Sequence, residues 1–117
     1  MVLSLLSIYG QENEEDYILP THHIIYQEVN EILQAIIATQ PAISGELQLK
    51  IMKKEIKTVY TAAYNIKKQH ILFHERVYNF CKQQYPNNYK SFIAFILGHE
   101  LKHHYQKENG SDRKSVV

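Results

Sequence analysis

The sequence has a single cysteine, Cys81, among its 117 residues. It therefore cannot form an internal disulfide or a cysteine-only metal cluster, and cysteine usage leaves the cellular compartment open. A large charge of one sign is also lacking, since 13 basic and 12 acidic side chains give a formal net charge of +1. Nothing in this balance predicts binding to nucleic acid or to an anionic membrane. No apolar run is long enough to span a bilayer, so we expect no transmembrane span.

The remaining composition is that of one folded domain. Hydrophobic residues make up 44% of the chain and charged residues 21%, and 117 residues are enough to bury one modest core. We expect this domain to occupy residues 12–110. Residues 111–117 show no hydrophobic periodicity, which predicts a disordered tail.

Residues 1–11 leave two alternatives open. They form a short apolar run that ends in small and polar residues, just before the acidic stretch 12–16. This pattern is similar to that of a secretory signal peptide that lacks its basic first region. A signal-peptide remnant predicts a secreted or periplasmic protein, whereas a plain apolar tail predicts a cytoplasmic one.

Hydrophobic periodicity predicts an α+β fold. A helical period runs from Ile25 to Ile36, which predicts a long N-terminal helix that starts near Pro20 and Thr21 and ends near Thr39. Apolar and polar residues then alternate from Glu46 to Lys53, the pattern of a half-buried strand.

Two further strands and two further helices complete the expected fold. Residues 60–64 and 70–74 favour a hairpin, so we expect a small antiparallel sheet of about three strands. A short helix at 75–84 should follow, with its apolar residues Val77, Phe80 and Cys81 directed inward. Asn87 or Asn88 can then cap a last helix that packs against the sheet.

This last helix carries His99-Glu100-Leu101-Lys102-His103, the pattern H-E-x-x-H. Two histidines four residues apart lie one above the other on a helix, so both imidazoles can reach one Zn²⁺ ion at about 2.0–2.1 Å. Glu100 lies beside the first ligand, where its carboxylate can take a proton from a water that zinc has made more acidic. The pattern therefore predicts that His99 and His103 are metal ligands and that Glu100 is a general base.

An accidental match is the alternative, because the chain contains seven histidines and a helical histidine pair is usually structural or exposed. The residues before the motif argue against it. Phe92–Leu97 is wholly apolar, which predicts that His99 is at least partly buried and needs a partner such as a metal. Gly98 would also let another backbone approach closely.

The stretch Gly98–His103 resembles the active-site helix of the zincin metallopeptidases, in particular the gluzincin (M48-like) branch. The close match covers about ten residues, and a looser one covers roughly residues 47–106, where a sheet and a short helix precede the motif. The resemblance implies a zinc metallopeptidase that acts on a peptide or protein substrate. It also implies an edge strand that lines the cleft and pairs with the extended substrate backbone.

The resemblance does not supply a third zinc ligand. In gluzincins this ligand is a Glu on a later helix, and the only acidic residues after His103 are Glu108 and Asp112. Glu108 is rotated away from the shared face, His104 points elsewhere, and His70 and His74 are conceivable substitutes from the sheet. The sequence therefore predicts a truncated peptidase or a non-catalytic interaction module that keeps the zincin scaffold. A small helical protein with a chance motif is the third alternative.

Overall fold

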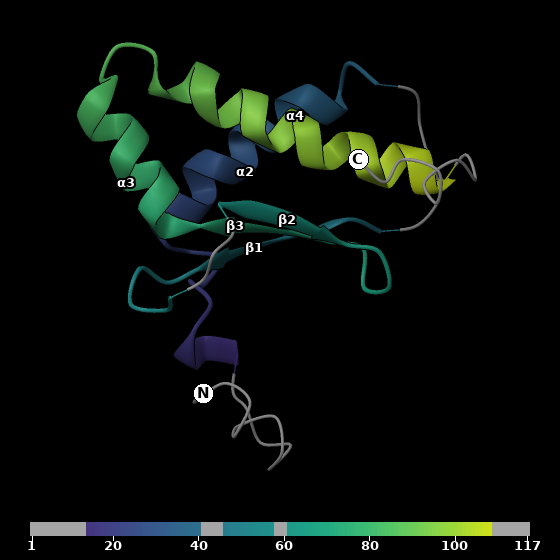
Figure 1. Cartoon of the computed structure of the whole chain (residues 1–117), viewed down its shortest axis with the longest axis horizontal. Coiled ribbons are helices and arrows are strands. Elements are labelled where there is room, and N and C mark those ends of the chain that lie inside the picture. The colour runs from purple at the N-terminus through teal and green to yellow at the C-terminus, as the bar shows by residue number, and fades with distance from the viewer. Residues whose placement is uncertain (1–13, 41–45, 58–60, 109–117) are drawn as a thin grey trace.

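In the computed structural model, which describes residues 14–40, 46–57 and 61–108, the chain forms the expected α+β fold (Figure 1). Its elements in chain order are the 3₁₀ helix η1 (Glu14–Asp16), α2 (Ile24–Ile37), β1 (Gln48–Met52), β2 (Ala62–Asn65), β3 (His70–His74), α3 (Glu75–Gln84) and α4 (Tyr89–Glu108). Within the described residues, no helix is both long and apolar enough to cross a bilayer. The predicted signal-peptide remnant at 1–11 and tail at 111–117 lie outside the described residues.

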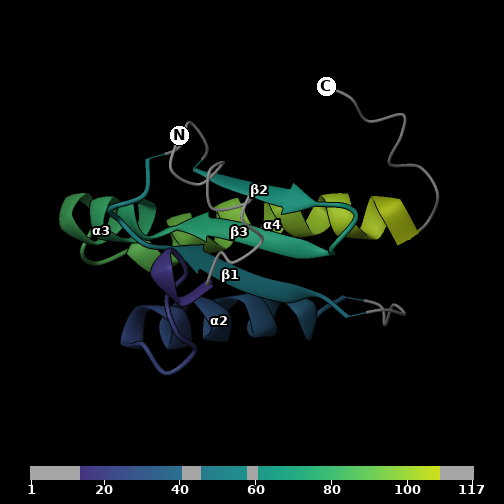
Figure 2. The same cartoon turned by 90° about the horizontal axis from the view of Figure 1, so that it is seen from below.

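The sheet is mixed, so the prediction of an antiparallel sheet is wrong. β2 and β3 form the expected antiparallel hairpin, but β1 pairs with β3 in parallel, with Leu49 opposite Ile71, and the strand order is β1-β3-β2. β1 and β2 form the two outer strands, and β3, the last of the three in the sequence, lies between them (Figure 2). Strand patterns report which residues alternate, and they carry no information about this order.

The two edges of the sheet differ. Residues just before α2 lie along the outer edge of β1, where the Leu19 N–H donates to Ile51 and the Lys53 N–H donates to Tyr17, both at 2.8 Å. β2 forms the other edge, and its only pairing among the described strands is with β3.

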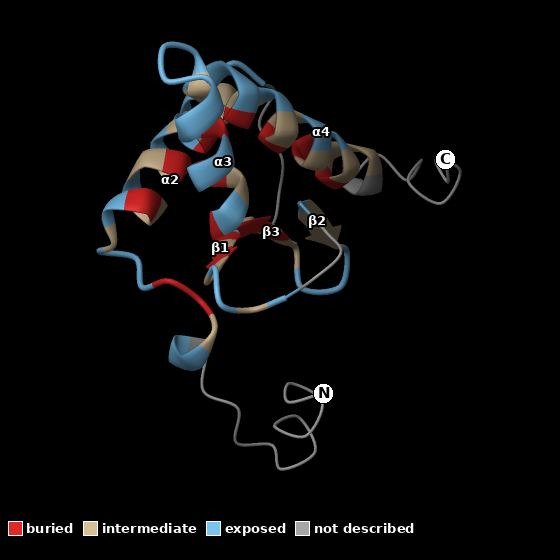
Figure 3. Cartoon of the chain, turned by 60° about the vertical axis from the view of Figure 1, so that its left-hand side comes forward, coloured by how far each residue is buried: buried red, intermediate tan, exposed pale blue. Residues whose placement is uncertain are grey.

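One face of the sheet packs on α2 and α4 (Figures 2 and 3). The core between these layers holds Leu49, Ile51, Ile71 and Phe73 from the sheet, with Val29, Leu33, Ile93 and Leu97 from the helices. Alternate residues of β1 and β3 therefore face the helices, which confirms the alternation predicted for the first of these strands.

Helix α2 has the predicted apolar stripe, but it begins at a different residue than predicted. Ile25, Val29 and Leu33 are buried, whereas the cap is His23 rather than Pro20 or Thr21. The His23 Nδ1 accepts a hydrogen bond from the Ile25 N–H at 3.0 Å, which satisfies one of the exposed N–H groups at the helix start.

The bounds of α3 are those predicted, and of its predicted inward residues Val77 and Cys81 are confirmed, whereas Phe80 is wrong. Cys81 is buried, as expected, while Phe80 is 56% exposed and Tyr78 is buried at 5%. Tyr78 takes the inner position because its hydroxyl reaches a polar partner on α2, the Glu28 carboxylate.

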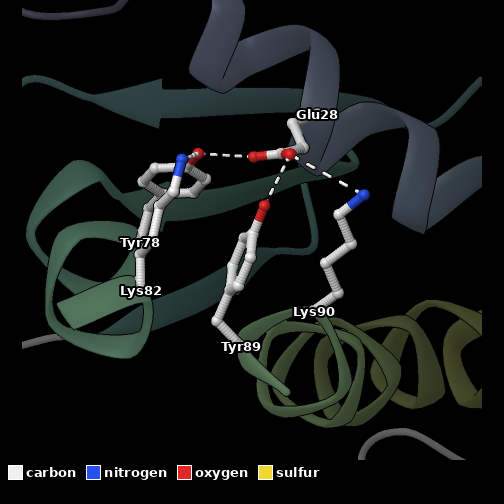
Figure 4. Close-up of polar contacts among 5 residues, drawn as sticks. All are labelled: Glu28, Tyr78, Lys82, Tyr89 and Lys90. Atoms are coloured by element: carbon white, nitrogen blue, oxygen red, sulfur yellow. Dashed lines mark hydrogen bonds and ion pairs between the residues drawn. The ribbon is translucent and has the colours of Figure 1, made fainter. Parts of the chain in front are cut away.

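Glu28 connects three helices. Its carboxylate accepts hydrogen bonds from Tyr78 on α3 and, at 2.7 Å, from Tyr89 on α4, and Lys90 lies 3.7 Å away (Figure 4). Lys82 completes the group, with its ammonium 5.5 Å from the centres of both tyrosine rings. Hydrogen bonds to a half-buried carboxylate are stronger than neutral ones, so this cluster fixes the start of α4 against α2.

Candidate metal-binding helix

Helix α4 has apolar side chains on its inner face and also on a second, more exposed side, where Ile96 still packs partly against the core. Its inner face carries Ile93, Leu97, Leu101 and His104, which are buried against the core at 0–3% exposure. Its outer stripe, defined here as the residues Phe92, Phe95, Ile96, His99 and His103, follows from a rotation of 100° per residue. An apolar helix of a folded protein is normally apolar on one face, so the outer stripe needs a separate explanation.

His99 lies on this outer stripe and is exposed, so the prediction that it is at least partly buried is wrong. The apolar residues before His99 divide between two sides of α4. Ile93 and Leu97 face the core, whereas Phe92 and Phe95 lie on the same side as His99 and are exposed. His103, one turn later, is half-buried.

The two motif imidazoles lie side by side. Their ring centroids are 5.2 Å apart, and the ring planes are inclined at 89°. Two nitrogen ligands of a tetrahedral zinc ion are separated by about 3.3 Å, since each Zn–N bond is about 2.0–2.1 Å long. Nitrogen atoms of neighbouring imidazoles at this centroid separation can reach that spacing by rotation about their side-chain bonds. The ring separation is therefore compatible with two nitrogen ligands of one metal ion.

Glu100 is half-buried between the two motif histidines in the sequence. Burial raises the pKa of its carboxyl group above the ordinary value, an effect that the nearby His99 and His103 partly offset. A carboxylate with a raised pKa is a better proton acceptor in its ionised form, which suits the predicted role of a general base.

A third ligand does not join the pair within the part of the chain that the structure describes. No group of three or more His, Cys, Asp and Glu side chains there could hold a metal ion. The side chain of Glu108 and all of Asp112 lie outside the described residues.

The two histidines from the sheet are engaged elsewhere. The His74 Nδ1 accepts from the Arg76 N–H at 3.1 Å and caps α3, while its Nε2 donates to the Ile56 carbonyl at 2.6 Å. His70 has the same parity along β3 as His74, so it lies on the face of the sheet opposite α2 and α4. Neither histidine is placed to complete a site on α4.

His104 points away from the motif, as predicted, and is fully buried. A hydrogen bond of 2.7 Å joins its Nδ1 to the hydroxyl of Tyr64 on β2 (partners 40 residues apart). Sequence periodicity did not predict this pair, although strand parity is consistent with it, since Tyr64 lies on the helix-facing side of the edge strand.

Gly98 is not a site of close backbone approach, so that prediction is also wrong. A Cβ atom placed on it would meet no heavy atom within 4 Å. The position borders a shallow hollow between α4 and the end of α2.

Strand β2, whose only pairing among the described strands is with β3, lies beside α4. Because the His74 N–H donates to the Thr61 carbonyl, Thr61 and Ala63 belong to the pairs that bond to β3, and the backbone of Ala62 and Tyr64 faces the outer edge. A groove of ≈ 490 Å³ adjoins this edge between α3 and α4, lined by Thr61, Arg76, Val77, Phe80, Cys81, Tyr85, Phe92, Phe95 and Ile96. An edge strand, an aromatic groove and the histidine pair are thus neighbours.

Comparison with known proteins identifies no relative: the chain matches no family model, no curated protein and no solved structure.

Proposed function

We propose that α4 carries the metal-binding half of a zinc-dependent metallopeptidase site. The observation that carries the proposal is the pair of imidazoles at His99 and His103, on the open side of a helix and with Glu100 between them. When bound, zinc would supply Lewis-acid chemistry to water and to a peptide carbonyl.

The residues of the chain have separable roles in this proposal. His99 and His103 hold the metal, and Glu100 accepts and returns a proton. The outward backbone groups of Ala62 and Tyr64 can form strand-type hydrogen bonds with an extended peptide. The aromatic groove beside them suits an apolar side chain of that peptide.

Two ligands hold zinc less firmly than three, and they fix the reacting groups less accurately. A misplacement of about 1 Å can lower a rate by a hundredfold. We therefore expect zinc binding that is weak and peptide hydrolysis that is slow.

The test combines binding and turnover. Zinc affinity is measured by competition with a chromophoric chelator, and hydrolysis of an unstructured protein substrate is followed with and without zinc. His103→Ala should lose the zinc affinity, and Glu100→Gln should keep the affinity but abolish turnover. Equal zinc binding by His103→Ala and wild type would refute the site, and turnover unchanged in Glu100→Gln would refute the general base.

A second candidate function is that of a non-catalytic interaction module, and exposed aromatic residues on the outer stripe favour it. Phe95 is 78% exposed and Phe92 42% exposed, next to the histidine pair. Large exposed apolar side chains that gather on one face are typical of a binding surface. Zinc binding without any turnover sensitive to Glu100→Gln would favour this function over the first.

A further inference from the structure

Two features of α4 lack an explanation within the part of the chain that the structure describes. The histidine pair offers two nitrogens, whereas zinc in proteins is almost always bound by four groups. The outer stripe also exposes Phe95 and Phe92 to solvent, although the inner face of the same helix already serves the core. Both features lie on one continuous face, because Phe95, Ile96, His99 and His103 follow each other within about two turns.

We propose that a second copy of the chain covers this face, and that one zinc ion bridges the two copies through His99 and His103 of each. A two-fold interface repeats the same surface on both sides, so each copy contributes the same two ligands. Two chelating pairs make the four nitrogens of a tetrahedral site. This inference rests on the zinc pair of the proposed function and adds the partner that completes it.

The residues around the pair suit such a contact. Phe95 lies about one turn before His99, so it meets the partner next to the metal and excludes water from it, whereas Ile96 packs partly against the core of its own chain. Aromatic residues at the centre of an interface contribute most of its affinity. The formal net charge of +1 also opposes self-association very little.

The dimer has a consequence for the proposed activity. A catalytic zinc site keeps one position open for water or substrate, whereas a structural site is closed. Four imidazoles leave no open position, so the bridged dimer is a resting form and only dissociated chains expose the metal. Turnover per chain should therefore fall as the concentration of protein rises.

The experiment measures mass and stoichiometry together, with Zn²⁺ alone as the probe. Sedimentation equilibrium of the full chain should show 13.8 kDa with a chelator and twice that mass with zinc. Titration should end at one zinc per two chains. Co²⁺ in place of zinc should develop the strong visible absorption of a tetrahedral site in step with the dimer.

Variants separate the metal from the apolar contact. His99→Ala, at an exposed position that the fold does not need, should remain a monomer with zinc. Phe95→Ser should keep zinc binding and raise the dissociation constant of the dimer at least tenfold, because each copy loses a buried ring. Ile24→Ser, at a residue on α2 that is 68% exposed, is the matched control and should change neither quantity.

Three results would overturn the inference. One zinc per monomer would show that the site is completed without a second copy, and it would leave the proposed function standing. A dimer that persists in His99→Ala or with a chelator would show that zinc is not the bridge. Absence of zinc binding at His99 and His103 would remove both this inference and the proposed function.

Discussion

At Gly98, the addition of one Cβ atom by substitution with alanine tests how closely the surroundings pack against α4. Glycine inside a helix costs about 0.5–1 kcal/mol relative to alanine, because its backbone loses more freedom on folding. A Cβ atom at Gly98 meets nothing within 4 Å, so no clash offsets that gain. We expect Gly98→Ala to raise the free energy of unfolding by about 0.5–1 kcal/mol in urea denaturation.

Ala94→Gly, four residues earlier on the same helix, is the matched control. It should lower the free energy of unfolding by about the same amount. A loss of stability in Gly98→Ala would contradict the open surroundings of Gly98. It would instead support the close backbone approach that the sequence predicts at this position, directly before the motif.

At the scale of single residues, the sequence could predict the chemistry of the motif but not its exposure. The spacing of His99 and His103 determines that they share a face of α4, whatever that face contacts. Which face packs on the core depends on Ile93, Leu97 and Leu101, and these alternate with an equally apolar set on the other side. Periodicity alone could not distinguish the two faces.

Tyr64 and His104 connect two elements, the edge strand β2 and helix α4. The hydrogen bond between them is 2.7 Å long, and His104 is fully buried. Tyr64→Phe removes one partner and leaves a buried ring nitrogen without that bond. We expect the free energy of unfolding to fall by about 1–3 kcal/mol, the cost of a buried polar group that loses its partner.

Urea denaturation of Tyr64→Phe beside Tyr85→Phe measures this difference. Tyr85 is 41% exposed, so loss of its hydroxyl should change the free energy of unfolding by less than about 0.5 kcal/mol. Equal effects of the two substitutions would contradict the structural role of the Tyr64–His104 bond.

At the scale of elements, local pattern predicted the strands and the bounds of α3 but not the order of the sheet. The alternation around Leu49 and Ile51 determines which side of β1 is buried, and the structure confirms it. The parallel pairing of β1 with β3 joins strands that are far apart in the sequence, with Gln48 opposite His70. Pairing across that distance is decided by the packing of the whole molecule, in particular by the residues before α2 that lie along the other edge of β1.

The Glu28 cluster makes the stability of the whole molecule depend on pH. Burial by itself would raise the pKa of Glu28, but hydrogen bonds from Tyr78 and Tyr89, with Lys90 and Lys82, lower it below the ordinary 4.5. Burial and the Glu28 carboxylate raise the pKa of Tyr78 to about 12. Tyr89 reaches about 12 chiefly through its hydrogen bond to Glu28.

The signs of these shifts define a window of stability. A carboxyl group whose pKa is lowered by folding stabilises the protein above its ordinary pKa, and that contribution is lost as the pH falls. Tyrosines whose pKa is raised stabilise it below their ordinary pKa of 10.0, and the contribution is lost as the pH rises towards about 12. The full stabilisation by the Glu28 cluster is therefore present between the ordinary carboxyl pKa of 4.5 and the ordinary tyrosine pKa of 10.0.

The alkaline limit is tested by comparing variants, because the lysines and the other tyrosines of the chain also titrate in this range and affect wild type and variant alike. We expect the urea midpoint of the wild type to fall as the pH rises from about 9 to about 12, since both tyrosines must lose protons beside a carboxylate. Glu28→Gln removes that charge, so it should lower the midpoint at neutral pH and make the alkaline decline shallower. Glu31→Gln, at an exposed position three residues further along α2, should keep the wild-type profile. Parallel profiles for Glu28→Gln and wild type would show that the three helices are held together without this carboxylate, and that packing alone positions α4 and its histidine pair.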